Sequence, residues 1–198
     1  RDKNESTIYL CDDKNYYDNQ GNLVDVPLEI PSTWLWVKLD DIYQHNTGKA
    51  LNEKNREGEL LEYITTSNLY WNFFVLSDLK KMYFKSSEVE KCTIKEGDLL
   101  VCEGGDVGRA AIWNEKYSMR IQNHIHRLRH YYPISNMFYY YVLRLYKHMK
   151  YIGGKGIGIQ GLSSNALGNI LMPLPPLSIQ TKITTVVENI YKFIDSNE

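Results

Sequence analysis

One segment, residues 156–183, constrains the fold of this chain more than any other part of its sequence. It begins with a glycine-rich loop, and glycine permits positive φ and a close approach of the backbone to a ligand. Ser163 or Ser164 can then cap a short helical turn, and residues 170–174 predict a short strand that its proline places at a sheet edge. A Pro-Pro pair ends that strand and precedes a predicted helix. The apolar residues of this helix are Ile179, Ile183, Val186, Ile190 and Phe193.

The rest of the chain predicts a mixed α+β fold. Runs rich in Tyr, Val, Ile and Trp, bounded by Gly and Asn turns, predict strands. They fall at residues 35–39, 61–65, 82–84, 98–103, 109–113 and 122–128. The clearest helix spans residues 136–150, because Ser135 can cap it, its apolar residues form one stripe, and Gly153-Gly154 stops it.

Composition limits the class of protein. A chain of 198 residues is long enough for one domain with a real core. Its three cysteines, Cys11, Cys92 and Cys102, are odd in number and widely spaced, which argues against a disulfide framework and favours a reducing compartment. The polar start of the sequence is not a signal peptide, and no run of about 18 apolar residues predicts a membrane span. We therefore expect a cytoplasmic protein.

Charge is unevenly distributed along the chain, although the net charge is only −1. Residues 1–30 carry three Lys and Arg against seven Asp and Glu. Residues 107–187 carry ten Lys and Arg and a single acid, Glu115. A field of one sign attracts polyanions, and phosphate neutralisation supplies most non-specific DNA affinity. The Asn, Gln, Arg and Tyr residues interleaved with these charges can read base edges and phosphates, so DNA binding is favoured over a merely solvated surface.

The glycine-rich loop formally matches a dinucleotide-binding fingerprint at Gly156, Gly158 and Gly161. That fingerprint requires a preceding strand, a helix directly after it and an acid about 20 residues later. Here a predicted helix precedes the loop, a short turn follows it, and the next acid is Glu188. We therefore favour a phosphate-cradling or DNA-facing loop, with Lys155 supplying the charge.

Three histidines suggest a metal site. His124 and His126 would lie on one face of a strand, and His130 shares their parity, so together they could ligate zinc. Between residues 116 and 187 no Cys, Asp or Glu accompanies them, so the second shell that such ligands need is not evident. Structural or DNA-facing histidines explain this strand better.

Catalytic motifs are not evident in the sequence. It contains no G-x-S-x-G elbow, no Walker loop and no Asp/Asn-Pro-Pro-Tyr/Phe motif of amino-methyltransferases. Cys102 falls within a predicted strand, where a cysteine is usually a small buried hydrophobe. Glu103 and Asp106 could bind a cation, but a turn at the end of a strand explains them more simply. We expect a chain without catalytic machinery and without a cofactor of its own.

The segment that ends the chain resembles the end of a target recognition domain in the specificity subunits of type I restriction–modification systems. In that family a Gly-rich loop with a Gln leads through a Leu…Leu…Ile-x-x-Pro-x-Pro-Pro-Leu-x-Glu-Gln-x-x-Ile run into a long helix. The chain matches this pattern at Gln160, Leu162, Leu167, Ile170, Pro173, Pro175, Pro176, Leu177, Gln180 and Ile183. It departs at Ile179, where the family usually has a Glu that would help to cap the helix.

Three earlier segments also resemble this family, in the same order along the chain. Residues 30–42 are similar to the opening of the domain, an Ile-Pro-x-x-Trp followed by a short strand. Residues 97–112 are similar to its central Gly-Asp strand, glycine turn and returning Gly-Arg strand. Residues 122–128 resemble the strand that follows. Four such segments in the right order are more specific than any one of them.

The resemblance implies a non-catalytic DNA specificity subunit. Its fold would be a twisted, mixed, barrel-like β-sheet domain with flanking helices and a C-terminal coiled-coil-type helix. Residues 1–30 would be a polar N-terminal tether, residues 31–176 the target recognition domain, and residues 177–198 the start of the conserved helix. The domain would read one half of a split site on double-stranded DNA. Its partners would be the modification (methyltransferase) and restriction subunits, which bind the methyl donor and ATP, and a second recognition domain.

The candidate DNA contacts combine cations with amides and hydroxyls in predicted loops and strand ends. They are Lys49, Thr66, Ser67, Asn68, Arg109, Gln122, Asn123, His124, Lys155 and Gln160. The C-terminal helix has the 4-3-4-3 apolar spacing of a coiled coil, although the same stripe could pack on its own domain. Its candidate partner contacts are Ile179, Ile183, Val186, Ile190 and Phe193. Two alternatives stay open: a metal-binding enzyme domain built on His124 and His126, and a coiled-coil interaction module that binds no nucleic acid.

Overall fold

The computed structural model describes residues 8–153 and 161–197 of the chain. The strands are β1 (Tyr9–Leu10), β2 (Tyr16–Tyr17), β3 (Leu23–Val24), β4 (Leu35–Lys38), β5 (Tyr43–Thr47), β6 (Glu59–Ile64), β7 (Leu69–Tyr70), β8 (Phe73–Phe74), β9 (Lys80–Phe84), β10 (Thr93–Ile94), β11 (Leu99–Cys102), β12 (Ala110–Ile112), β13 (Met119–Ile121), β14 (Ile125–His130) and β15 (Leu171–Leu174). The helices are α1 (Leu39–Ile42), α2 (Ser86–Cys92), α3 (Asn136–His148), α4 (Ser164–Gly168) and α5 (Leu177–Asp195). The predicted α+β class is confirmed.

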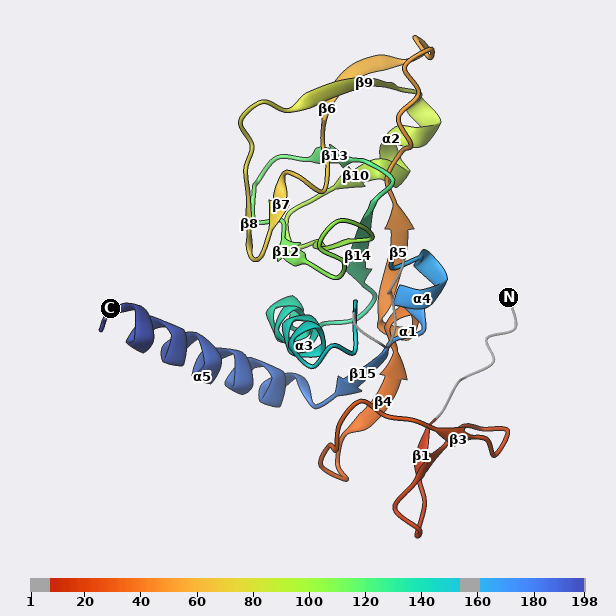
Figure 1. Ribbon diagram of the computed structural model, residues 1–198, viewed down its shortest axis with the longest axis vertical. Helices are drawn as coiled ribbons and strands as arrows, with labels where there is room; N and C mark the ends of the chain where they lie inside the picture. The colour runs from red at the N-terminus through yellow and green to blue at the C-terminus, as the bar shows by residue number, and fades with distance from the viewer. Residues whose placement is uncertain (1–7, 154–160, 198) are drawn as a thin grey trace.

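Two four-stranded sheets form the body of the domain (Figure 1). One has the strand order β10-β13-β6-β9, and the other has the order β12-β11-β14-β5. All strand pairs within them are antiparallel except β6 with β13, which is parallel. A parallel bridge between Lys49, just after β5, and Gln122, just after β13, joins the two sheets. The described strands therefore form a mixed arrangement of several sheets that does not close into a barrel.

Strand β11 is buried on both faces, which explains its uninterrupted apolar sequence. Side chains alternate across a strand, so Leu99 and Val101 pack with residues of α3 in one hydrophobic cluster. Leu100 and Cys102 face the other way, into a second cluster that contains Trp113. All four residues of β11 are fully buried. The strand therefore joins the two halves of the core.

A two-stranded sheet of β4 and β15 lies below the main body in Figure 1, beside a small sheet of order β1-β2-β3. Pro173 of β15 pairs with Trp36 of β4, which agrees with the predicted preference of this proline for a sheet edge. Ile8, Trp36 and Leu171 form a buried cluster to which apolar side chains of residues 16–30 add. The N-terminal segment is thus folded against the domain, a structure that its polar composition did not predict.

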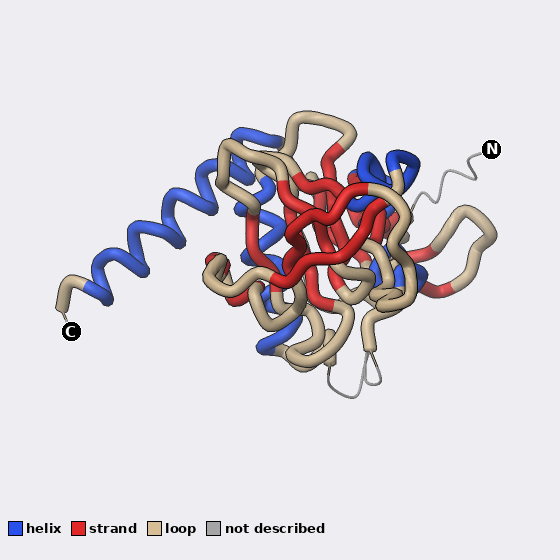
Figure 2. The backbone as a smooth tube through the Cα atoms, turned by 90° about the horizontal axis from the view of Figure 1, so that it is seen from above, coloured by secondary structure: helices blue, strands red, loops and turns tan. Residues whose placement is uncertain are grey.

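Helices α3 and α5 begin side by side and are joined by a buried amide. Ser135 caps α3 as predicted, because its hydroxyl accepts a hydrogen bond from the N–H of Phe138 at 3.2 Å. The Gln180 side chain accepts from the Ser135 N–H at 2.8 Å and donates to the Pro175 carbonyl at 2.9 Å. Helix α5 then projects away from the body of the domain (Figures 1 and 2). No described helix combines the length and hydropathy that crossing a membrane requires.

The predicted strand at residues 122–128 is wrong in one respect, because a turn at residues 122–124 separates β13 from β14. Strand β13 pairs with β6 and β10, and β14 pairs with β11 and β5, so the chain passes from one sheet to the other here. Gly48 makes room for this crossing, since a Cβ at that position would lie 2.0 Å from the carbonyl oxygen of Ile121. No glycine or proline marks the turn in the sequence.

Candidate nucleic-acid interface

Three turns meet at one end of the two main sheets. Strands β6 and β13 are parallel, so the turns that follow them, residues 65–68 and 122–124, lie at the same edge. A backbone hydrogen bond of 3.0 Å also links the second of these turns to the end of β6. The turn after β11, residues 103–109, joins them, because the Glu103 N–H donates to the His124 carbonyl at 2.9 Å. We term this group the turn cluster.

The turn at residues 65–68 is built around the amide of Asn68. Its Oδ1 accepts hydrogen bonds from the backbone N–H and the hydroxyl of Thr65, both at 2.9 Å. Its Nδ2 donates to the carbonyl of Val75, just after β8, at 3.1 Å. Ser67 is exposed at the tip, and its hydroxyl lies 2.7 Å from that of Thr65. Ser67 is therefore accessible to an external ligand, whereas the amide of Asn68 is already engaged.

Arg109 ends the turn at residues 103–109 and points back to the first turn. Its guanidinium donates to the Thr66 carbonyl at 2.6 Å and lies 5.1 Å from the ring centroid of Tyr70. Tyr70 stacks on Phe73, with centroids 4.9 Å apart and planes 9° from parallel. Both aromatic side chains are exposed, at 38% and 54%. This pair is not among the predicted contacts, although two aromatics that flank a Trp-Asn turn mark it in the sequence.

Lys49 lies where the two sheets meet, and its charge is paired within the domain. The ammonium donates to the Tyr83 carbonyl at 2.8 Å and to the carboxylate of Glu88 at 2.5 Å. Only 10% of the Lys49 side chain is exposed. The hydrogen bond from Lys49 holds the pKa of Glu88 below its ordinary value. Lys49 thereby fastens α2 and β9 to the end of β5.

The turn at residues 122–124 presents an amide and an imidazole next to a carboxylate. The His124 side chain is 55% exposed, and its Nδ1 lies 3.2 Å from Glu103 Oε2. An ionised carboxylate can only accept, so the hydrogen of the ring is on Nδ1. The other ring nitrogen lies 3.5 Å from Nδ2 of Asn123, which can donate to it. Gln122 and Asn123 are half-buried at the surface of the turn.

The two acids of the turn at residues 103–109 have separate partners and do not share a cation. Glu103 faces His124, whereas Asp106 pairs with Lys147 at 2.9 Å. Lys147 also donates to the Val107 carbonyl at 2.7 Å, which fastens α3 to this turn. Within residues 8–153 and 161–197, no group of three or more His, Cys, Asp or Glu side chains could hold a metal ion.

The three predicted histidine ligands are also separated. Strand β14 begins at Ile125, so His124 belongs to the preceding turn and is exposed. His126 is fully buried inside the domain, and His130 is exposed at the end of the strand. The expectation that His124 and His126 share one face of a strand is therefore wrong, because the turn at residues 122–124 interrupts the alternation.

His126 instead belongs to a chain of hydrogen-bonded groups that we term the histidine clamp: Asp40, His45, His126 and the carbonyl of Leu162. Asp40 Oδ1 lies 3.2 Å from His45 Nδ1. His45 Nε2 lies 2.9 Å from His126 Nδ1. His126 Nε2 lies 2.7 Å from the Leu162 oxygen. The clamp therefore connects α1, β5, β14 and Leu162, the residue before the N-cap of α4.

The hydrogen positions in the clamp follow from its acceptors. A carbonyl only accepts, so His126 donates from Nε2, and its Nδ1 is left to accept from His45. The Nε2 of His45 therefore carries a hydrogen and donates to His126. Burial lowers the pKa of His126 from 6.5 to about 4, which keeps this ring neutral. The two rings are shielded from water, because the His45 side chain is only 7% exposed and His126 is fully buried, whereas Asp40 lies at the surface.

The clamp also reaches the turn cluster. The N–H of Leu162 donates to the Glu103 carbonyl at 2.8 Å, so the group that His126 fixes also fixes Glu103. Lys155 and Gln160, together with Gly156 and Gly158 of the fingerprint match, lie outside the described residues. The structure therefore brings Thr66, Ser67, Asn68, Arg109, Gln122, Asn123 and His124 together and places Lys49 at their margin.

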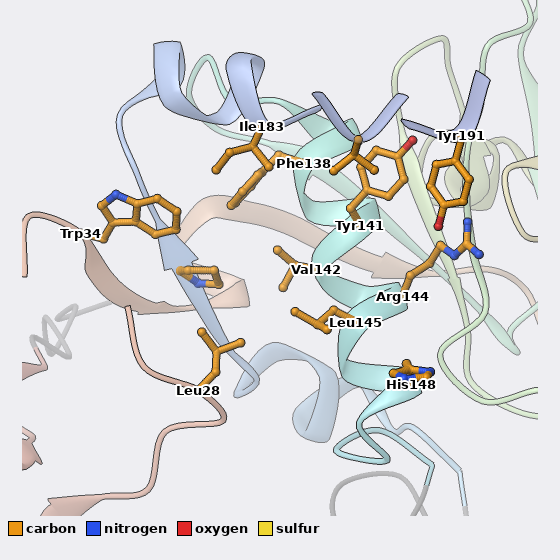
Figure 3. Close-up of a pocket in the computed structure, with 12 residues that line it drawn as sticks. Leu28, Trp34, Phe138, Tyr141, Val142, Arg144, Leu145, His148, Ile183 and Tyr191 are labelled. Carbon is orange, nitrogen blue, oxygen red and sulfur yellow. The ribbon is translucent and has the colours of Figure 1, made fainter. Parts of the chain in front are cut away.

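An apolar groove of about 520 Å³ lies between α3 and α5 (Figure 3). Ile183 faces Phe138 across it, and Trp34 closes one side. At the other side Tyr191 stacks on Tyr141, with centroids 6.2 Å apart and planes 14° from parallel. The first part of α5 thus packs on its own domain.

The apolar stripe of α5 divides between two environments. Ile179 and Ile183 are half-buried, and Ile183 packs against the main core. Val186, Ile190 and Phe193 are 50%, 53% and 71% exposed. The apolar stripe therefore packs on its own domain at the start of α5, as the alternative interpretation predicted. Its second half packs against no other part of the described chain.

A family model described as "Type I restriction modification DNA specificity domain" matches residues 31–198 of the chain. Solved structures also share its fold. A chain of a type I R-M system, studied for complex assembly and conformational transition, is 18% identical with a TM-score of 0.64. The HsdS subunit from Thermoanaerobacter tengcongensis is likewise 18% identical with a TM-score of 0.64. A type I restriction-modification system S subunit from M. genitalium is 16% identical with a TM-score of 0.54.

The matches cover most of this chain but less than half of each relative. They span 86%, 86% and 87% of this chain in the three cases. The corresponding shares of the relatives are 41%, 40% and 43%. At this level of identity the likeness establishes the fold.

Proposed function

Because the chain belongs to the type I restriction modification DNA specificity domain family, we propose that it is one target recognition domain of a specificity subunit. In this proposal residues 31–176 bind one half of a split site on double-stranded DNA. Residues 1–30 and 177–198 connect the domain to its neighbours. Modification and restriction subunits carry out the chemistry and bind the methyl donor and ATP, while this chain only recognises the DNA sequence. The complex would act in the cytoplasm, where chromosomal DNA is accessible.

The turn cluster is the observation that carries this proposal. Base edges are read by hydrogen-bonding side chains that a rigid scaffold holds at a protein surface. Backbone hydrogen bonds fix the turn at residues 122–124 to the end of β6 and to Glu103, just after β11. The Arg109 side chain fixes the turn at residues 65–68 to the turn at residues 103–109. The polar groups at their tips are therefore preorganised, as base recognition requires. The net positive charge of residues 107–187 would attract the phosphates around them.

The candidate residues divide into two groups by their contacts. Ser67, Gln122, Asn123 and His124 have polar groups at the surface of the turn cluster, so we propose that they meet base edges or phosphates, with Thr66 beside them. Lys49, Asn68 and Arg109 are engaged within the domain. We propose that these three shape the turns that face DNA.

Two candidates enter the proposal on sequence grounds alone, because both lie outside the described residues. Lys155 stands in a glycine-rich segment without a nearby acid, which suits a phosphate contact. Gln160 has an amide that can donate and accept, which suits an adenine edge.

We propose that the exposed half of α5 binds a helix of the complex. Val186, Ile190 and Phe193 keep the 4-3 spacing of a coiled-coil seam, and their exposure leaves apolar surface to cover. A second recognition domain, in the same or another chain, and the modification subunits are the expected neighbours. No specific contact favours either alternative function. His124 and His126 lie in different environments and do not form a metal site. A coiled-coil interaction module without nucleic acid would not account for the polar side chains of the turn cluster.

A comparison of two asparagines tests the proposal. Asn123 lies in the turn cluster, and Asn114 lies in the exposed loop at the opposite end of β13. In the assembled complex, Asn123→Ala should reduce affinity for the cognate duplex by about 1–3 kcal/mol, and Asn114→Ala should have little effect. Duplex retention at increasing salt should also show a log–log slope that reports several phosphate contacts. Equal DNA affinity of the two variants would indicate that DNA does not bind at the turn cluster. Duplex retention that does not change with salt would contradict phosphate binding by this domain.

A further inference from the structure

Glu103 is an acid at the centre of a surface that we propose to bind a polyanion, and this inference rests on that proposed function. The turn cluster places it between His124 and Leu162, and 29% of its side chain is exposed. A carboxylate in this position would repel phosphates, which lowers affinity for every DNA sequence alike. The presence of Glu103 is explained if its carboxylate accepts a hydrogen bond from a group that only some DNA sequences present.

The Glu103 carboxylate is held in a fixed place. The Glu103 N–H donates to the His124 carbonyl at 2.9 Å, and the Glu103 carbonyl accepts from the Leu162 N–H at 2.8 Å. The side chain is fixed as well, because Oε2 faces His124 Nδ1 at 3.2 Å. The other oxygen, Oε1, makes no hydrogen bond to the part of the chain that the structure describes. One acceptor atom is thus oriented and free.

The glycine that follows indicates that a partner comes close to this carboxylate. A Cβ on Gly104 would meet no described atom within 4 Å, so packing against the described residues does not require glycine there. Gly104 also lacks the positive φ that Gly105 and Gly108 adopt, so its backbone conformation does not require glycine either. Gly104 is half-buried, and a residue without a side chain at such a position lets another molecule approach the backbone.

The chemistry of a carboxylate restricts what that molecule can offer. An ionised carboxylate only accepts hydrogen bonds, so it cannot pair with a phosphate or with the acceptor groups of guanine and thymine. In the major groove the donors are the exocyclic amino groups of cytosine N4 and adenine N6. We propose that Glu103 is a specificity-determining residue that accepts a hydrogen bond from such an amino group, and that Gly104 leaves room for the DNA beside it.

The test uses the intact restriction–modification system with Glu103→Gln in this chain. Gln keeps the size of the side chain and one acceptor but adds a donor, so it changes base preference without leaving a cavity. Sequencing the methylated genome should show an altered or relaxed base at one position of one half-site. Binding of the original site should fall by roughly 5- to 150-fold. The position that changes identifies cytosine or adenine as the base read by wild-type Glu103.

Glu115→Gln is the matched control, because Glu115 is exposed in the loop at the opposite end of β13 and the change in net charge is the same. It should leave the methylated sequence unchanged. Gly104→Ala provides a second arm: the domain should melt at the same or a higher temperature, while DNA affinity falls at least several-fold.

The outcomes separate this inference from the proposed function. An unchanged methylated sequence in Glu103→Gln would overturn the inference, and so would tighter binding to all sequences alike, which indicates a general charge effect. Full DNA affinity in Gly104→Ala would also contradict it. The proposed function stands in each of these cases, provided that the wild-type system still methylates a split sequence. If the wild-type chain directs no such methylation, the proposed function fails.

Discussion

Acidification should destabilise this domain through one buried side chain, His126. Burial lowers the pKa of its ring from 6.5 to about 4 in the folded protein. Between these values the unfolded chain binds a proton that the folded chain does not, so the free energy of unfolding rises with pH across the window. The contribution of His126 is therefore fully present above pH 6.5 and is lost as the pH falls through 4.

The size of the effect follows from the pKa shift. At about 1.4 kcal/mol per pKa unit, a shift from 6.5 to about 4 corresponds to about 3 kcal/mol of stability. That is a large share of the roughly 5–15 kcal/mol by which a domain is usually stable. The histidine clamp gives the physical cause, because a proton on His126 Nδ1 would face the N–H of His45 across 2.9 Å. His126 is fully buried, so solvent does little to screen this interaction.

Urea unfolding followed by tryptophan fluorescence, from pH 4 to 7.5, measures the effect in wild type and in His126→Gln. The amide keeps a donor and an acceptor but does not titrate. Asp40, His45 and His124, which act on His126 electrostatically, are present in both proteins. The stability of wild type relative to the variant should therefore fall by about 3 kcal/mol from pH 7 to pH 4. His130→Gln, at an exposed site, should follow wild type. A wild-type to His126→Gln difference that is constant with pH would refute the clamp.

Three other changes test the remaining parts of the structure. Replacing Ile190 and Phe193 by Asp should weaken assembly with partner subunits in sedimentation and leave the melting temperature of the domain unchanged, because both side chains are exposed on α5. Gly48→Ala should cost about 1–3 kcal/mol in urea unfolding, because its Cβ would meet the Ile121 carbonyl. Lys155→Ala should weaken binding to all DNA sequences alike and lower the slope of log affinity against log salt concentration by about one unit. Gln160→Ala should relax the sequence preference at one base pair. Unchanged assembly of the Ile190 and Phe193 double variant would contradict the first expectation, and unchanged stability of Gly48→Ala would contradict the second. A change of the recognised sequence in Lys155→Ala would contradict the third.

The features of the fold that depend on local chemistry could be predicted from the sequence. Ser135 caps α3 through its own neighbour three residues later, and Ser163 caps α4 in the same way. The apolar run of β11 predicts a strand that is buried on both faces. The turn at residues 122–124 was not predicted, because pairing of β13 and β14 with different sheets creates it, and its sequence contains Asn123 but no glycine or proline.

The candidate site depends on contacts between residues that are distant in sequence. Lys49 resembles a free loop cation until Glu88, 39 positions away, is placed beside it. His45 and His126 are 81 positions apart, so the pattern of histidines on one strand suggested a metal site and concealed the clamp. Glu103 appeared to end a strand. Only the three-dimensional contact with His124 in the turn cluster indicates that its carboxylate is held at the proposed DNA-binding surface.

Exchange of the recognition domain tests the central claim most directly. Residues 31–176 would be replaced by the corresponding segment of another specificity chain in an otherwise intact system, and the methylated sequences of the host genome would be mapped before and after. The account predicts that one half of the split sequence changes to that of the donor chain, while the other half is retained. A methylated sequence that stays the same in both halves would show that this domain does not choose the DNA target.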